Sequence, residues 1–352
     1  MKSSPLKFLY PGWYAIVMGL AGLSLAWHRA VPLMGEPAAA VSAAVGGVAA
    51  VVFGLLAAAT VARGWRHPDA WGEDRRHPVR HTFIAALPIA VLLLATVAVA
   101  LVGPTFWARA LWWAGSLSQL LVTVWVLGRW WRGNQAGGLQ WMSVTPALFI
   151  PIVGNLLAPL AGVPLGHTEW ATAQCGIGLM FWPIVLVMIL VRIATQGMFP
   201  DRLLPTIFIF IAPPAVAGLV ALTLGASPLV AWMAWGMALF GLLWVGTQTR
   251  RIVALPFSLP HWAMSFPLAA LAALTLRLAA LPAGAGTAAA GTSAAGAVQG
   301  PFAVLGLALL ALASIVILAL AVATLRGLRD GTLLAPEPVA AIHPAATGGG
   351  PA

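Results

Sequence analysis

Charged side chains, cysteine and tyrosine are scarce in this chain of 352 residues. Only 7% of the residues are charged, and the chain has one cysteine and two tyrosines. With 61% hydrophobic residues and a mean hydropathy of +0.96, the composition excludes a water-soluble globular domain and is typical of a polytopic membrane protein. The single Cys175 also excludes an intramolecular disulfide.

The sequence also lacks the motifs of enzyme active sites. It has no acid pair, nucleophile elbow, phosphate-binding glycine loop or zinc-binding helix motif, and its apolar segments contain almost no ionisable groups. We therefore expect no enzyme activity, no catalytic residue, no metal and no cofactor. An integral-membrane enzyme or scaffold is the least favoured alternative, because it needs polar side chains clustered within the spans.

Ten apolar segments are long enough to cross a bilayer, which takes about 20 residues. We expect a cytoplasmic N-terminus over residues 1–11, a transmembrane domain over 12–326 and a disordered cytoplasmic tail over 327–352. The low-complexity loop 283–299 is predicted to be mobile. The predicted spans are 12–31, 38–62, 82–102, 106–128, 141–162, 170–195, 203–224, 228–248, 258–281 and 300–325.

The net charge of +10 follows the loops between these spans and does not indicate a nucleic-acid partner. With ten spans, 15 of the 18 basic residues fall on one side of the membrane, and only Arg29, Arg109 and Arg277 fall on the other. The positive-inside rule then places both termini in the cytoplasm of a multi-pass protein of the cell (inner or plasma) membrane. A cleaved signal peptide after Lys2 and Lys7 is an alternative, but its removal would spoil this segregation of charge.

Prolines recur in the middle of every second span from the third onward. Pro88, Pro151, Pro213 and Pro267 are separated by 63, 62 and 54 residues. A proline inside a helix removes a backbone hydrogen bond and bends the helix, and the freed carbonyl is tolerated in lipid only where it faces protein or water. We therefore expect a repeat of helix pairs, with the odd-numbered helices around a shared conduit. The first helix has Gly19 in place of an internal proline.

Two further residues near span centres can either line this conduit or stabilise the helices. Asn155 can line the path or cap a carbonyl freed by a bend, and we prefer the structural role because an amide in lipid needs a local partner. Phe266 directly precedes Pro267, where a ring turned into a narrow axis would exclude water and block ions. The alternative for Phe266 is simple packing against lipid or a neighbouring helix.

Five segments, one in each odd-numbered helix, resemble the family of the bacterial tellurite-resistance protein TehA, the plant guard-cell slow anion channel and the fungal dicarboxylate and sulfite transporters. Their order and spacing, rather than any one of them, carry the resemblance. They are GWYAIVMGLAGLSLAW (12–27), HPVRHTFIAALPIAVLLLA (77–95), PIVGNLLAPLAG (151–162), LPTIFIFIAPPAVAGL (204–219) and LPFSLPHWAMSFPLAAL (255–271).

The resemblance implies an all-α integral membrane fold of ten transmembrane helices, arranged as five helical hairpins around a pseudo-fivefold central pore. It also implies a homotrimer with one pore in each subunit. By its position in the SFPL segment, Phe266 corresponds to the gate of that pore. Family members commonly have a proline where this chain has Val17, so we expect a less symmetric pore or a straighter first helix.

These observations predict a gated anion channel that passes small inorganic or organic anions through a pore lined by the odd-numbered helices. Phe266 is the predicted plug, and Gly19, Pro88, Pro151, Asn155, Pro213 and Pro267 are the predicted pore-lining or bend residues. No titratable side chain is evident near a span centre, where a proton-coupled carrier usually buries one. The alternative is a secondary transporter or exporter of oxyanions such as C4-dicarboxylate, sulfite or tellurite.

Overall fold

The computed structural model describes residues 5–133, 135, 137–281 and 300–335, and every regular element in these ranges is helical. Within them, nine helices are long and apolar enough to cross a membrane, which confirms an all-helical, multi-pass membrane fold. They span Pro11–Met34, Glu36–Arg66, Arg80–Val102, Phe106–Arg132, Thr168–Gln196, Asp201–Thr223, Pro228–Gly246, Leu259–Ala279 and Pro301–Arg329.

The segment predicted as the fifth span is shorter than expected. Its apolar helix covers Pro146–Gly162, whereas the prediction begins at residue 141. Residues Trp141–Ser143 form a separate 3-10 turn, and Thr145 is extended. The physical reason is Pro146, because a proline disfavours helical geometry in the residue before it.

Five helices are composite, because a 3-10 segment leads directly into an α-helix. We call these the composite helices. They are η2 (Pro11–Tyr14) with α1 (Ala15–Met34), η3 (Arg80–Ala85) with α4 (Ala86–Val102), η6 (Pro146–Leu148) with α6 (Phe149–Leu156), η7 (Asp201–Ile211) with α9 (Ala212–Thr223), and η8 (Leu259–Met264) with α12 (Ser265–Ala279). After a break at Leu157, α7 (Ala158–Gly162) continues the third of them.

The recurring prolines lie at the start of the α-helical parts, which corrects the expectation that they bend continuous helices. Pro88, Pro151 and Pro267 are each the third residue of their α-helix. In α9 this position belongs to Pro214, and Pro213 precedes it. A proline is well tolerated there because N–H groups in the first turn of an α-helix have no partner four residues back within that helix.

Val17 occupies the same third position in α1, and α1 still follows a 3-10 segment. In all five composite helices, the change from 3-10 to α geometry therefore comes two residues before this position, whether the position holds a proline or, as in α1, a valine.

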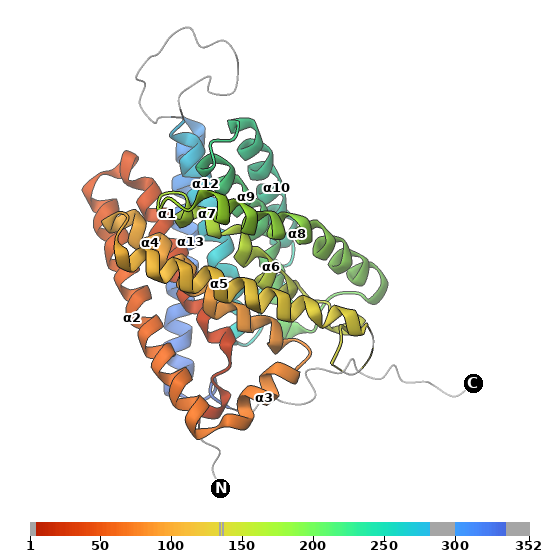
Figure 1. Ribbon diagram of the computed structural model, residues 1–352. Coiled ribbons are helices and arrows are strands. Elements are labelled where there is room, and N and C mark those ends of the chain that lie inside the picture. Colours follow the sequence, from red (N-terminus) through yellow and green to blue (C-terminus); the bar gives the residue numbers. More distant parts are fainter. Residues whose placement is uncertain (1–4, 134, 136, 282–299, 336–352) are drawn as a thin grey trace.

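The other long helices are α2 (Glu36–Arg66), α5 (Phe106–Gly128), α8 (Thr168–Gln196), α10 (Pro228–Gly246) and α13 (Pro301–Arg329). We call these the continuous helices. They are far more exposed than the composite ones: within the most apolar window, 17% of Glu36–Arg66 is buried against 89% of Asp201–Thr223. In Figure 1, α5 and α8 cross the front of the bundle.

Each composite helix packs on the continuous helix that follows it in the sequence. The pairs are α1 with α2, α4 with α5, α6 with α8, α9 with α10, and α12 with α13. The composite helices also contact one another in a closed series, from α1 to α4, α6, α9, α12 and back to α1. Their 3-10 segments repeat this series, from η2 to η3, η6, η7, η8 and back to η2. The five composite helices therefore run in the same direction.

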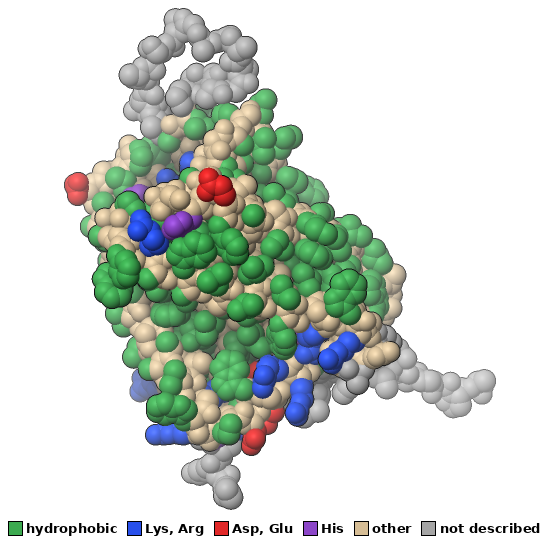
Figure 2. All heavy atoms as spheres, in the orientation of Figure 1, with side chains coloured by type: hydrophobic (Ala, Val, Ile, Leu, Met, Phe, Trp, Pro, Cys, Tyr) green, Lys and Arg blue, Asp and Glu red, His purple; other side chains and the backbone are tan. Residues whose placement is uncertain are grey.

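The 3-10 segments begin at one end of the bundle, which we call the basic end because Arg63, Arg80 and Arg202 line a cavity there. Figure 2 shows Lys and Arg side chains gathered at the lower end of the visible face, below a largely hydrophobic middle. The short helix α3 (Pro68–Arg76) also lies at this lower end in Figure 1.

The C-terminal boundary differs from the predicted one. Helix α13 extends to Arg329, so residues 327–329 are helical instead of belonging to a disordered tail. Of the segments predicted to be disordered or mobile, residues 336–352 and the loop 283–299 lie outside the described residues.

Candidate functional site

A small cavity of about 50 Å³ lies at the level where the composite helices change from 3-10 to α geometry. We call it the narrow cavity. All five composite helices line it, with Ala15, Ala86, Ile150, Ala212 and Phe266 among the lining residues. No charged side chain occurs among the described residues that line it. Its volume is enough for one or two water molecules, since a water occupies about 30 Å³ in the liquid.

Phe266 is the second residue of α12, and its ring lies between the narrow cavity and helix α1. The side chain is 7% exposed. A Cβ added at Gly22 of α1 would come within 2.9 Å of Cδ2 of the ring, so the absent side chain of Gly22 leaves room for Phe266. Pro267 also lines the narrow cavity.

The other predicted bend residues lie in the helix contacts around the narrow cavity and are not among its lining residues. Gly19 faces Ser265 and Trp262, so it allows α1 to approach α12 closely. Pro88, Pro151 and Pro213 are buried in the first turns of α4, α6 and α9.

Asn155 points toward the continuous helices and belongs to a buried hydrogen-bond network. Its Nδ2 donates to Oγ1 of Thr123 at 2.8 Å and to the carbonyl oxygen of Pro151 at 2.9 Å. Its Oδ1 accepts from Nε2 of Gln174 at 3.1 Å. Nε2 of Gln119 also donates to the Pro151 carbonyl, at 2.8 Å. The network therefore joins α5, α6 and α8, as the structural role of this amide requires.

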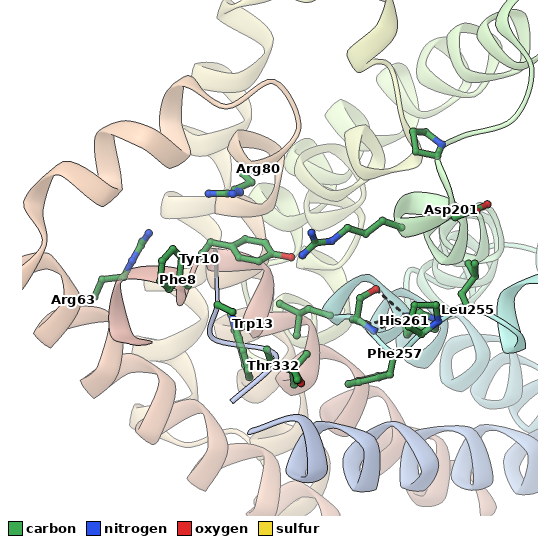
Figure 3. Close-up of a pocket in the computed structure, with 17 residues that line it drawn as sticks. Phe8, Tyr10, Trp13, Arg63, Arg80, Asp201, Leu255, Phe257, His261 and Thr332 are labelled. Atoms are coloured by element: carbon green, nitrogen blue, oxygen red, sulfur yellow. Dashed lines mark hydrogen bonds between the residues drawn. The ribbon is translucent and has the colours of Figure 1, made fainter. Parts of the chain in front are cut away.

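A second cavity, of about 520 Å³, opens at the basic end, and we call it the wide cavity (Figure 3). Arg63, Arg80 and Arg202 are among its lining residues. Tyr10 and Leu259 line both the wide and the narrow cavity, so the two cavities adjoin at these side chains.

Two arginines of the wide cavity, Arg63 and Arg80, share one carboxylate. Arg63 is 2% exposed and pairs with the fully buried Asp74, with 2.7 Å between Nη1 and Oδ2. Arg80 approaches the other carboxylate oxygen of Asp74 at 3.5 Å and is more exposed. One carboxylate thus faces two guanidinium groups. Asp201 also lines the wide cavity and pairs with Arg251 at 2.6 Å, so the described lining holds three arginines and one carboxylate.

The backbone adds to this positive potential. The N-terminal ends of all five composite helices lie at the basic end, and a helix N-terminus carries a partial positive charge of about half an elementary charge. The basic end therefore combines basic side chains with aligned helix dipoles.

Sequence reasoning missed Tyr10 and the partners of Asn155. Tyr10 is one of only two tyrosines and directly precedes Pro11 and Gly12, a local signal that marks the start of the first composite helix. Gln119 and Gln174 are amides within predicted spans, which is itself a signal, because an amide in lipid needs a partner.

Comparison with known proteins assigns the architecture to a family. A family model described as voltage-dependent anion channel, SLAC1, matches residues 9–325. The chain belongs to the SLAC1 family. This confirms the resemblance carried by the five segments and makes anion transport, rather than enzyme catalysis, the activity of its family.

Relatives in this family come from plants, bacteria and archaea. The chain is 27% identical over 214 residues to the S-type anion channel SLAH2 of Arabidopsis thaliana, a match that covers 59% of this chain and 40% of the plant protein. It is 28% identical over 265 residues to the tellurite resistance protein TehA homolog of Haemophilus influenzae, covering 74% and 78% of the two chains. A transporter of Methanocaldococcus jannaschii, MJ0576, is 24% identical over 76% of this chain and 83% of its own length.

Proposed function

We propose that this SLAC1-family protein is a gated anion channel whose pore runs between the five composite helices and is closed at Phe266. The observation that carries the proposal is the narrow cavity, which all five composite helices line together with the Phe266 ring. Ten transmembrane helices, with Pro146–Gly162 as the short fifth, form five hairpins around a pseudo-fivefold axis in this proposal.

The packing of the helices supports this arrangement. Each composite helix contacts the next continuous helix in sequence, as a hairpin requires, and the composite helices contact one another in a closed series. The common direction of the five composite helices supports an axis of approximate fivefold symmetry. A closed ring of buried helices also keeps irregular backbone away from lipid, where unpaired carbonyl and N–H groups are costly.

The preference for anions comes from the field along the pore and not from a fixed charge inside it. Arginines outnumber carboxylates three to one among the described residues that line the wide cavity, which are Arg63, Arg80 and Arg202 against Asp201, and the helix N-termini contribute partial positive charges. Basic side chains at a cavity mouth raise the local concentration of anions. The apolar narrow cavity then selects anions by size and by the cost of losing hydration water. By the positive-inside rule, the basic end faces the cytoplasm.

In this proposal Phe266 closes the pore from the α1 side of the narrow cavity. The ring is almost fully buried between the narrow cavity and Gly22, and the surrounding wall is apolar. The narrow cavity has room for only one or two water molecules and no charged side chain among its described lining residues, so an ion that enters it must shed most of its hydration shell, and such a hydrophobic constriction blocks ions. Opening requires the ring to move out of the axis.

The homotrimer and the location in the cell (inner or plasma) membrane are part of the proposal. The continuous helices present exposed apolar side chains, including Leu55, Phe240 and Leu325, to lipid or to neighbouring subunits.

Flux measurements on the purified protein in proteoliposomes distinguish a channel from a carrier. A channel dissipates a chloride or nitrate gradient passively, and its reversal potential follows the anion gradient alone. A carrier for C4-dicarboxylate, sulfite or tellurite instead accumulates its substrate against a gradient when a proton gradient is imposed. Accumulation of radiolabelled malate or sulfite would overturn the channel proposal in favour of the carrier.

A further inference from the structure

The ring of Tyr10 lies at the junction of the wide and the narrow cavity. Tyr10 and Leu259 are the residues that line both cavities. In Figure 3 the Tyr10 side chain extends into the wide cavity between Arg80 and Trp13. Of the two shared side chains, Tyr10 is the larger, and it carries the only hydroxyl.

Four features hold the ring in this place. The backbone of Tyr10 is extended, with φ −81° and ψ 163°, as expected for the residue before Pro11. The edge of the ring meets Phe83, with 6.0 Å between centroids and 89° between planes. The guanidinium of Arg80 lies over the ring, 5.6 Å from its centroid. On a further side lies Gly12, where a Cβ would overlap with Cε2 of Tyr10.

The Tyr10 ring therefore occupies the space that a side chain at residue 12 would need, and this space is open because residue 12 is glycine. The clash would involve Cε2, Cζ and Oη of Tyr10, which are the far end of a side chain that can rotate away. A methyl group at Gly12 thus displaces the ring without removing it.

We propose that Tyr10 forms a second restriction in series with Phe266, between the basic cavity and the lumen. An anion leaving the wide cavity must pass the ring edge, where the apolar ring offers little to replace lost hydration water. The restriction therefore admits small monovalent anions that lose their hydration at low cost, and it retards larger or doubly charged ones. This inference deepens the proposed channel function and rests on it.

Cysteine accessibility tests the restriction without measuring current. Met18 lines the narrow cavity and is not among the lining residues of the wide cavity, so Met18→Cys reports entry into the lumen. The only native cysteine, Cys175, is buried and is replaced by alanine in every variant. Inverted membrane vesicles receive the anionic reagent methanethiosulfonate ethylsulfonate at the basic end, and the remaining free thiol is counted with a fluorescent maleimide.

Tyr10→Ala and Gly12→Ala should each raise the modification rate of Met18→Cys about tenfold, a factor that matches the energy of an aromatic edge contact such as Tyr10–Phe83. Tyr10→Phe keeps the ring and should keep the slow rate. The control is Thr332→Cys, which lines the wide cavity and should react equally fast in all backgrounds.

An unchanged Met18→Cys rate in both Tyr10→Ala and Gly12→Ala would overturn the proposal. So would a rise at Thr332→Cys of the same size, because that indicates general loosening. If Tyr10→Ala does not fold, Gly12→Ala decides the result. Because labelling needs no ion flow, loss of this restriction leaves the channel proposal intact, and a protein without current can still show the restriction.

Discussion

Replacing Asn155 by leucine should destabilise the protein without changing which anions it passes. The substitution keeps the number and branching of the side-chain heavy atoms and removes four hydrogen bonds, to Thr123, Pro151, Ile152 and Gln174. Interhelical hydrogen bonds in membrane proteins contribute about 0.6 kcal/mol each on average. The two bonds to Thr123 and Gln174 join different helices and the other two lie within α6, so the expected loss in free energy of unfolding is about 1–2 kcal/mol.

The expected loss in free energy of unfolding is no larger because the hydrogen-bond partners of Asn155 keep other partners. The Pro151 carbonyl keeps the hydrogen bond from Thr123 at 2.6 Å, and Nε2 of Gln174 keeps the Ser116 carbonyl at 3.0 Å. A buried polar group left without any partner would add a further 1–3 kcal/mol, roughly.

The assay is reversible unfolding of the purified protein by SDS titration in mixed micelles, followed by tryptophan fluorescence, together with anion permeability ratios in liposomes. The matched control is Thr96→Val, which removes a buried hydroxyl that bonds only the Leu92 carbonyl within its own helix. The Thr96→Val substitution should lower the free energy of unfolding by less than about 1 kcal/mol. If Asn155→Leu shifted the permeability ratios and left stability unchanged, Asn155 would line the pathway and our reasoning would be wrong.

Two further substitutions test the basic end and the gate. Asp74→Ala leaves the buried Arg63 without its counter-ion and should lower stability by about 3 kcal/mol or more, whereas Asp201→Ala breaks an exposed pair with Arg251 and should lose less than about 1 kcal/mol. Equal losses in the same SDS titration would contradict the burial of the first pair. Gly22→Ala should push the Phe266 ring from α1 into the narrow cavity and lower the residual anion current. In a Phe266→Ala protein the same substitution should leave the anion current unchanged. An equal decrease in current with and without Phe266 would show that Gly22 does not act through the Phe266 ring.

The sequence alone predicts the membrane fold well, because long apolar runs and segregated arginines act locally along the chain. The prolines show where such reasoning ends. Their spacing indicates the repeat, but a proline fits both a bend inside a helix and the first turn of a new one. Only the three-dimensional fold shows that Pro88, Pro151, Pro214 and Pro267 mark a change from 3-10 to α geometry, a change that α1 makes at Val17 without proline.

The candidate site was less predictable, because it depends on contacts between residues far apart in the chain. Its place before Pro267 and the family resemblance single out Phe266. The Asn155 network joins residues 19 and 32 positions apart, and no local pattern specifies which amide meets which carbonyl. No span pattern indicates Tyr10, because this residue precedes the first predicted span, which begins at residue 12.

The central claim is that Phe266 closes an anion pore between the composite helices. Single-channel current recordings in planar bilayers test this claim most directly. Phe266→Ala should raise the chloride or nitrate current by more than about tenfold, because the apolar constriction is removed. Phe240→Ala removes the same side chain from the 66%-exposed outer position on α10 and should leave the current at the wild-type level. A folded Phe266→Ala protein whose current equals that of the wild type would contradict the account.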